Sequence, residues 1–391
     1  MAPSVLALAE DARPPAAALA LGVLLVGFAM FAIWWWRRPA GPVVVAELWV
    51  YPIKSCAGVR MDAAVMQRAG LQWDREFAVM KPDGEVLTQK VYPTLAKIQP
   101  SLQCSQQMMG TAVPATPGPG ADLTGITLSS TAMSATVHVD LTSGCEMVPQ
   151  TTIWGGNSEP LDAVRLPAAD KWLTEHMGFQ CSLCRLTARR ALRTTRLAPV
   201  ANDPQDSCRY QDGSPLTVLS EASVAALNRK LGSACSVSPH RFRPNIIVSG
   251  CGAFEETQWT ALRVGDEAVP IRMLMEAYRC TMVTIAQLAE SSVADDAAGT
   301  RPAGHKVSKV MKSFLSRDVE THGPLPRDNP NFAVFAAPGL DESTLHEGDL
   351  VEVVGTLTSS GARSLYKHNE RQSRYRWRLD EARFWHVEGE K

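Results

Sequence analysis

The sequence has almost no net charge and little cysteine for its length. Lys and Arg total 39 against 40 Asp and Glu over 391 residues, which gives a formal charge of −1. This balance disfavours a nucleic-acid-binding protein that works through a broad basic field, although it is compatible with a local basic pocket. The nine cysteines are an odd number at irregular spacings. That pattern favours a reducing compartment over a secreted protein stabilised by disulfides.

Several catalytic and ligand-binding motifs are missing as well. The chain has no GxxxxGK[ST], GxSxG or GxGxxG, which argues against P-loop kinases, α/β-hydrolases and Rossmann dehydrogenases. Its histidines form no HExxH or HxH spacing, so none is assigned as a metal ligand. One CxxC is present, Cys181 to Cys184, and His176 lies nearby. Because no second CxxC and no βαβ context accompany it, structural thiols are favoured over zinc or thioredoxin-like chemistry.

One long segment near the start lacks charge altogether. No charged residue occurs from Ala16 to Trp36, and a helix of this length spans about 31 Å at ~1.5 Å per residue, close to the thickness of a bilayer core. The segment ends in three tryptophans, followed by Arg37 and Arg38. We therefore expect a transmembrane anchor at 16–36 with the rest of the chain on the cytosolic face. A cleaved signal peptide is the alternative, but the residues that precede this segment are acidic and the apolar run is long.

The remaining chain shows a mostly β pattern with a few helices, which indicates the α+β class. Apolar or alternating runs predict strands at 43–53, 76–80, 85–89, 125–130, 135–141, 245–250, 261–271, 275–285 and 349–355. The 76–89 segment should form a hairpin around its KPDG turn. Helical spacing predicts helices at 168–178, 221–231 and 306–315, with Ser220 capping the second. Two stretches, 110–124 and 289–305, are predicted to be flexible insertions.

Four local groups could carry chemistry. They are Lys54-Ser55-Cys56 in a turn after the first strand, Asp74-Arg75, Arg241 to Asn245, and Arg279-Cys280 in a strand-like segment. If the ammonium, the hydroxyl and the guanidiniums converge, they suit an anion, most naturally a phosphate. A cysteine next to Arg279 should favour its thiolate, as a nucleophile or as a soft metal ligand. Each group also has a structural interpretation, because arginines at strand starts are often solvated and cysteines are often core residues.

The order of these groups resembles MOSC-domain proteins. The likeness rests on WVYPIKSCAG at 49–58, Asp74-Arg75, LSEAS at 219–223, RFRPNIIVSGCGAFEE at 241–256 and Arg279-Cys280-Thr281, and it extends over about 43–355. It is strongest to the mitochondrial amidoxime-reducing group, which are membrane-anchored molybdenum enzymes. The resemblance implies a MOSC N-terminal β-barrel domain at 42–190 and a MOSC β-barrel domain at 191–355. A tail and anchor at 1–41 would precede them, and a polar extension at 356–391 would follow.

The resemblance also implies the molybdenum cofactor, Mo-molybdopterin, bound in a groove between the two domains. Cys280 would be the metal ligand and the catalytic residue. The cofactor-binding residues would be Lys54, Ser55, Arg75, Gly213, Ser214, Arg243, Asn245, Tyr278 and Arg279. The implied reaction is two-electron reduction of the N–O bond of amidoximes, hydroxylamines and related N-hydroxylated compounds, with nitrite as a further candidate. Cytochrome b5 and NADH-cytochrome b5 reductase would supply the electrons, at the outer mitochondrial membrane facing the cytosol.

Two positions depart from the pattern that the resemblance leads us to expect. Gly213 stands where a hydroxyl residue is expected, and Tyr278 stands where a small residue is expected, which would narrow the substrate entrance. Two other functions remain open: a MOSC module that carries the cofactor or transfers sulfur, and a metal-free membrane scaffold. Because Lys54, Arg75 and Cys280 are all present, the enzyme is favoured.

Overall fold

The computed structural model describes thirteen ranges of the chain. They are 41–105, 121–142, 144–148, 151–153, 160–187, 193–194, 207–232, 236–287, 302–315, 330–339, 343–357, 376–379 and 385–388. The anchor expected at 16–36 and most of the two expected insertions lie outside these ranges. Within them, no helix is both long enough and apolar enough to cross a membrane.

The largest element of the fold is an eight-stranded sheet. In spatial order its strands are β2 (Val59–Met61), β1 (Val44–Val50), β15 (Ile246–Ser249), β14 (Leu216–Ser220), β18 (Asn331–Pro338), β17 (Val269–Tyr278), β16 (Trp259–Val264) and β20 (Val351–Thr356). β14 and β15 run parallel, and the other neighbours are antiparallel. Every residue of β14 and β18 is buried, which fits their continuous apolar sequences at the centre of the sheet.

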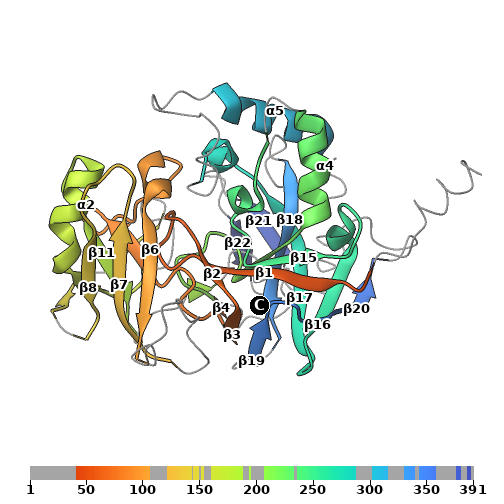
Figure 1. The fold of residues 1–391 in the computed structure, drawn as a ribbon, viewed down its shortest axis with the longest axis horizontal. Helices are drawn as coiled ribbons and strands as arrows, with labels where there is room; N and C mark the ends of the chain where they lie inside the picture. The colour runs from red at the N-terminus through yellow and green to blue at the C-terminus, as the bar shows by residue number, and fades with distance from the viewer. Residues whose placement is uncertain are drawn as a thin grey trace, which may run out of the picture. The chain divides into compact units, whose positions relative to one another are not determined.

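The smaller sheets bring together distant parts of the sequence. Their strands are β5 (Phe77–Met80), β11 (Ser182–Leu186), β10 (Ala163–Leu166) and β9 (Glu146–Met147) in one sheet; β19 (Ser343–His346), β3 (Ala63–Gln67) and β4 (Gly70–Leu71) in the next; and β6 (Gln99–Cys104), β7 (Leu123–Ser129) and β8 (Val137–Asp140) in a third. Figure 1 shows β7 between β6 and β8. Two pairs complete the set: β12 (Arg193–Thr194) with β13 (Ser207–Cys208), and β21 (Arg376–Leu379) with β22 (Trp385–Glu388).

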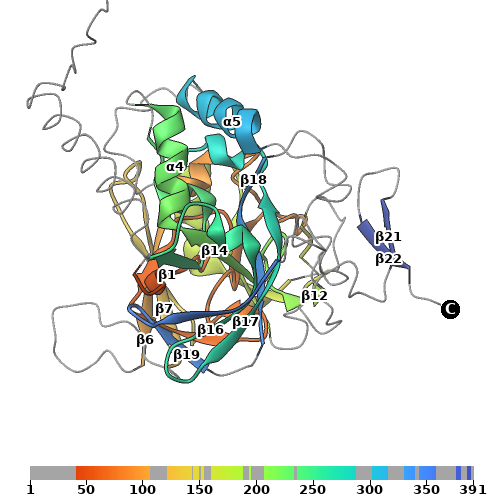
Figure 2. The ribbon, with the colours of Figure 1, turned by 90° about the vertical axis from the view of Figure 1, so that its right-hand side faces the viewer.

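The helices are short. They are α2 (Asp170–Met177), α4 (Glu221–Leu231) and α5 (Pro302–Leu315), together with the 3₁₀ helices η1 (Pro93–Lys97), η2 (Pro167–Ala169), η3 (Pro239–Phe242), η4 (Glu255–Gln258) and η5 (Thr281–Thr284). The Ser220 hydroxyl accepts a hydrogen bond from the Ala222 amide at 3.1 Å, so the predicted cap of α4 is confirmed. α4 and α5 lie side by side in both views (Figures 1 and 2) and bury their apolar faces in one cluster.

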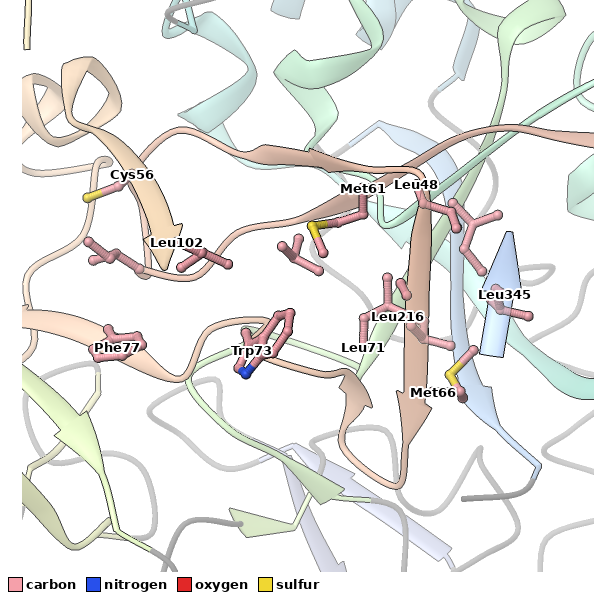
Figure 3. Close-up of a cluster of buried hydrophobic side chains, with 14 of the residues drawn as sticks. Leu48, Cys56, Met61, Met66, Leu71, Trp73, Phe77, Leu102, Leu216 and Leu345 are labelled. Carbon is pink, nitrogen blue, oxygen red and sulfur yellow. The ribbon is translucent and has the colours of Figure 1, made fainter. Parts of the chain in front are cut away.

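Buried side chains from both halves of the sequence form one main hydrophobic core. Leu48 of β1, Leu71 of β4, Leu216 of β14 and Leu345 of β19 are all fully buried and belong to the same cluster. Figure 3 shows Leu71, Leu216 and Leu345 gathered around Met66, although they lie far apart in the sequence. The first strands of the chain therefore complete the sheet and the core of the C-terminal half, which places the turn after β1 against that half.

One predicted strand ends earlier than expected. The apolar pattern predicts a strand over 275–285, but β17 ends at Tyr278 and Thr281–Thr284 form η5. Two interactions divert the chain here, one with a distant segment and one local. The Arg279 amide bonds to the Pro330 carbonyl at 2.9 Å, and the Cys280 sulfur accepts a hydrogen bond from the Met282 amide at the start of η5. The 275–285 strand prediction is therefore wrong after Tyr278.

The prediction of one strand over 261–271 is also wrong, because that segment contains the end of β16, a turn at 265–268 and the start of β17. The remaining strand and helix predictions agree with the structure to within a few residues at each end, apart from the second leg of the 76–89 hairpin. That leg makes an isolated bridge between Met80 and Val86 in place of a full strand. Helix α5 starts at Pro302, so the end of the predicted 289–305 insertion is helical. Leu123, within the predicted 110–124 insertion, belongs to β7.

Candidate functional site

The turn after β1 presents Lys54 and Ser55. The Lys54 amide bonds to the Phe77 carbonyl at 2.8 Å, which fixes the turn against β5. The Lys54 ammonium, only 4% exposed, donates to the Tyr210 carbonyl at 2.8 Å and to the Asp212 carboxylate at 2.5 Å. Asp212 itself is 48% exposed, so a buried cation is held by one carbonyl and one half-exposed carboxylate. These contacts place the ammonium in the wall of a pocket.

Tyr51 organises two of the predicted guanidiniums. Arg75 lies over the Tyr51 ring at 4.3 Å and Arg243 lies over it at 4.2 Å. Cation–π contacts of this kind are strengthened when the partners are desolvated. Arg75 also pairs with the buried Asp74 carboxylate and donates to the Arg243 carbonyl at 3.3 Å. The two cations are therefore held close together despite their mutual repulsion.

Arg243 and Arg279 each keep one end of the guanidinium available. Arg243 donates through Nη1 to the Cys56 carbonyl at 2.6 Å, and Arg279 donates through Nε and Nη1 to backbone carbonyls at 2.7 and 3.1 Å. The Nη2 atoms of both arginines are buried and have no hydrogen-bond partner in the described part of the chain. Burial lowers the pKa of each guanidinium to about 10, and the charge of Arg75 adds to this effect at Arg243. Both side chains still carry their proton at neutral pH, so the pocket holds two charged N–H donors without acceptors.

Backbone conformation at three of the predicted residues is unusual. Ser55, Arg75 and Arg243 have φ values of 70°, 50° and 53°, which is the left-handed region. Non-glycine residues rarely occupy this region, and such strain is concentrated at functional sites. In this protein the unusual backbone conformation occurs at three polar residues from separate segments that line the same pocket.

Cys280 lies directly after the irregular end of β17. The pairing of β17 with β18 shifts register between Glu276 and Tyr278, and Ala333 on β18 has a φ of 68°. A bulge of this kind re-aims the residues that follow it. As a result Cys280 leaves the sheet and lies partly exposed in the pocket.

Arg279 lowers the pKa of the Cys280 thiol, as expected, but it is not the largest influence on that pKa. Burial raises the pKa of the Cys280 thiol, and the Met282 amide and the nearby cations only partly offset this effect. The Arg279 guanidinium itself donates to the carbonyls of Phe242 and Phe332. A metal ion that binds the sulfur would itself displace the proton.

All ten predicted site residues line one pocket. They are Lys54, Ser55, Arg75, Gly213, Ser214, Arg243, Asn245, Tyr278, Arg279 and Cys280. The free space is about 840 Å³, a volume that includes the open mouth and adjoining solvent. Besides the cationic residues described above, Ser214 and Asn245 also bond to the protein itself. The Ser214 hydroxyl donates to the Leu216 carbonyl, and the Asn245 amide group bonds to the backbone of Thr217 and Trp49.

The pocket also includes residues outside the predicted set. They are Tyr210, Gln211, Asp212, Thr217, Arg241, Phe242, Met282, Val283 and Phe335. Arg241 lies in the 241–256 segment on which the resemblance rests, and Asp212 is next to the predicted Gly213, so the sequence indicated both positions. Phe335 is in the centre of a buried strand and lies far along the chain from the other residues, so no local pattern could have indicated it.

The CxxC cysteines are both buried and pack in different clusters. Cys181 lies in the main core, whereas Cys184 lies with Ala78 and Tyr210. The Cys184 thiol donates to the Ala78 carbonyl at 3.2 Å, and burial raises its pKa to about 12. Both positions fit the structural interpretation of this pair.

Comparison with known proteins identifies the parts of the chain. Residues 43–180 match the MOSC N-terminal beta barrel domain and residues 205–319 match the MOSC domain. Similar proteins include the mouse (Mus musculus) and human (Homo sapiens) mitochondrial amidoxime-reducing component 1, each 30% identical over 68% of this chain and 75% of the relative. The molybdenum cofactor sulfurase of Arabidopsis thaliana is 27% identical over 60% of this chain but only 28% of its own length. With both family models matched in sequence order around a single pocket, this chain belongs to the MOSC-domain family.

Proposed function

We propose that the chain is a molybdenum-cofactor-dependent reductase of N-hydroxylated compounds. The observation that carries this proposal is that Cys280 shares one pocket with buried guanidiniums whose Nη2 atoms lack a partner among the described residues. A phosphate-bearing group that also carries a soft metal satisfies both parts of this pocket. The names of the relatives, amidoxime-reducing components and a molybdenum cofactor sulfurase, support the same class of cofactor.

The residues present fit such a group. An unpartnered buried N–H is unfavourable by itself, because it has lost its hydrogen bond to water. Arg243 and Arg279 each have one, and phosphate oxygens would accept these bonds. Lys54 and Arg75 would hold the anion from the side of the first strands, and Cys280 would provide the protein's thiolate to the metal.

In this proposal the protein positions the reactants and sets the charge of the site. When bound, the cofactor would supply the chemistry for two-electron reduction of the N–O bond. Lys54 is held in one orientation by the Tyr210 carbonyl and the Asp212 carboxylate, so its charge stays fixed toward the pocket. The Tyr51 ring contacts both the Arg75 and the Arg243 guanidinium and so helps to hold them in place beside each other. The net reaction consumes two electrons and two protons and releases the N–H product and water.

We further propose that cytochrome b5, reduced by NADH-cytochrome b5 reductase, is the electron donor. In this proposal the 16–36 segment anchors the chain in the outer mitochondrial membrane with the pocket on the cytosolic side. Both similar amidoxime-reducing components are named as mitochondrial proteins, which supports this location.

The proposal is tested by the reduction of an amidoxime by the full-length chain. The protein is purified from a host that makes the molybdenum cofactor and is assayed with a reduced viologen dye, beside Cys280→Ala and a Cys145→Ala control. Cys145 is exposed and does not line the pocket. Wild type and Cys145→Ala should form the amidine at equal rates, and Cys280→Ala should lose the activity. Bound molybdenum without amidine formation in the wild type contradicts the reductase and favours a cofactor carrier.

A further inference from the structure

Two aromatic rings form one wall of the pocket that contains Cys280. The Tyr278 and Phe335 ring centroids are 5.5 Å apart and the ring planes are inclined at 81°, an edge-to-face pair. Both residues line the pocket, together with Cys280 and Gly213. Edge-to-face pairs are a preferred aromatic geometry and add stabilisation beyond the area they bury. The two rings therefore hold each other in a defined orientation beside Cys280.

Phe335 is the rigid member of this pair. It is 8% exposed and packs in a small buried cluster with Leu274, Met275, Ala277 and Ala337. On its pocket side the ring covers Gly213, where an added Cβ would lie 3.1 Å from both Cε2 and Cζ of the phenyl ring. The close approach explains the glycine: any side chain at position 213 would push against Phe335.

Tyr278 is the member that a ligand can reach. It is the last residue of β17, two positions before Cys280, and its side chain is only partly buried. The irregular pairing before it turns this end of β17 toward the pocket. Because Phe335 supports the ring from the side of the core, Tyr278 loses little conformational freedom when a ligand packs on it.

We propose that Tyr278, supported by Phe335 over Gly213, determines substrate specificity by packing against flat, conjugated groups attached to the N–O centre. This inference rests on the proposed function and adds to it a preference between substrates. An aromatic ring next to the amidoxime carbon can pack on Tyr278, whereas a methyl group cannot fill the same contact. From the energies of aromatic pairs, we expect roughly a 3- to 10-fold preference for the aromatic compound.

The test compares binding of benzamidoxime and acetamidoxime to the cofactor-loaded full-length chain without an electron donor. Calorimetric titration gives the ratio of the two dissociation constants within each protein, so differences in active fraction cancel. Wild type and Tyr278→Phe should prefer benzamidoxime, because both keep the ring. Tyr278→Ala should bring the ratio to about one. Gly213→Ser, which displaces Phe335, should lower the ratio without removing the Tyr278 side chain.

The matched control is Tyr92→Ala. Tyr92 forms another aromatic pair, with Phe179 at 5.2 Å, and does not line the pocket, so the ratio should remain that of wild type. An equal ratio in wild type and Tyr278→Ala overturns the inference, as does the absence of any preference in the wild type. Because this assay needs no turnover, a separate failure to reduce either compound after a donor is added would count against the reductase alone.

Discussion

Replacement of Arg243 by Met should barely change the stability of the cofactor-free protein while it removes the response to phosphate. Arg243 is 7% exposed, lies beside Arg75, and keeps one guanidinium nitrogen without a partner. A side chain of this kind is arranged for a ligand and contributes little to the fold in the ligand's absence. Met is an unbranched, uncharged side chain, shorter than Arg, that can fill part of the volume over the Tyr51 ring.

Two opposing contributions determine the size of the effect. Lowering the pKa of Arg243 from 12.5 to about 10 makes the charged side chain unfavourable by roughly 3 kcal/mol at neutral pH, since each pKa unit corresponds to about 1.4 kcal/mol. Removal of that charge is therefore favourable. The variant loses the bond to the Cys56 carbonyl and the contact with Tyr51, together about 2 to 4 kcal/mol. The net change in the free energy of unfolding should be about 1 kcal/mol or less.

The assay is urea unfolding of the cofactor-free full-length chain with and without inorganic phosphate. At ten times its dissociation constant, phosphate should stabilise the wild type by about 1.4 kcal/mol and the variant by much less. If the variant without phosphate loses more than about 3 kcal/mol of unfolding free energy, the Arg243 side chain stabilises the fold and the reasoning above is wrong. Equal stabilisation of the two proteins by phosphate would show that Arg243 does not contribute to phosphate binding.

Three further changes test local features. Ser55→Gly should relieve the left-handed backbone at φ 70° and stabilise the cofactor-free chain by about 1 kcal/mol in urea unfolding; a clear loss would contradict the strain at this turn. Burial lowers the pKa of His176 in the folded chain, so a proton binds this histidine more tightly in the unfolded chain. The wild type should therefore lose more unfolding free energy than His176→Phe between pH 7.5 and 5.5. Equal losses in the two proteins would contradict this prediction. Ser220→Ala should lower the unfolding free energy by about 1 kcal/mol, with Ser220→Thr retaining most of it; an unchanged value would mean that the cap is dispensable.

Part of the fold could be predicted from the sequence, where strands and helices follow simple apolar patterns, but β14 and β18 of the main sheet are not among the predicted strands. β1 and β15 alternate or run apolar over their whole length, and the cap of α4 is a local signal at Ser220. The end of β17 could not be predicted in this way. Residues 279–285 still include Met282, Val283 and Ile285, but the chain is diverted by the Met282–Cys280 bond at the start of η5 and by the contact of Arg279 with Pro330. Because that contact joins two segments that are distant in the sequence, the residues around Arg279 do not indicate it.

The candidate site was accessible from the sequence for a different reason. Its polar residues lie in short segments such as YPIKSC, and the resemblance to MOSC-domain proteins predicts that these segments contribute to one site. The structure adds what the segments do not specify. The stacking of Arg75 and Arg243 on Tyr51, the unpartnered Nη2 atoms and the raised pKa of Cys280 all depend on packing. Phe335 shows the same limit, because nothing in its buried strand indicates a pocket.

The central claim is that Cys280 is the protein's ligand to molybdenum in this pocket. X-ray absorption at the molybdenum edge tests it directly, with full-length wild type and Cys280→Ser purified from the same cofactor-producing host. The account predicts molybdenum in both proteins, with one sulfur ligand fewer in the variant. An identical sulfur environment in the two proteins would contradict the assignment of Cys280, and a wild type that binds no molybdenum would contradict the proposed cofactor.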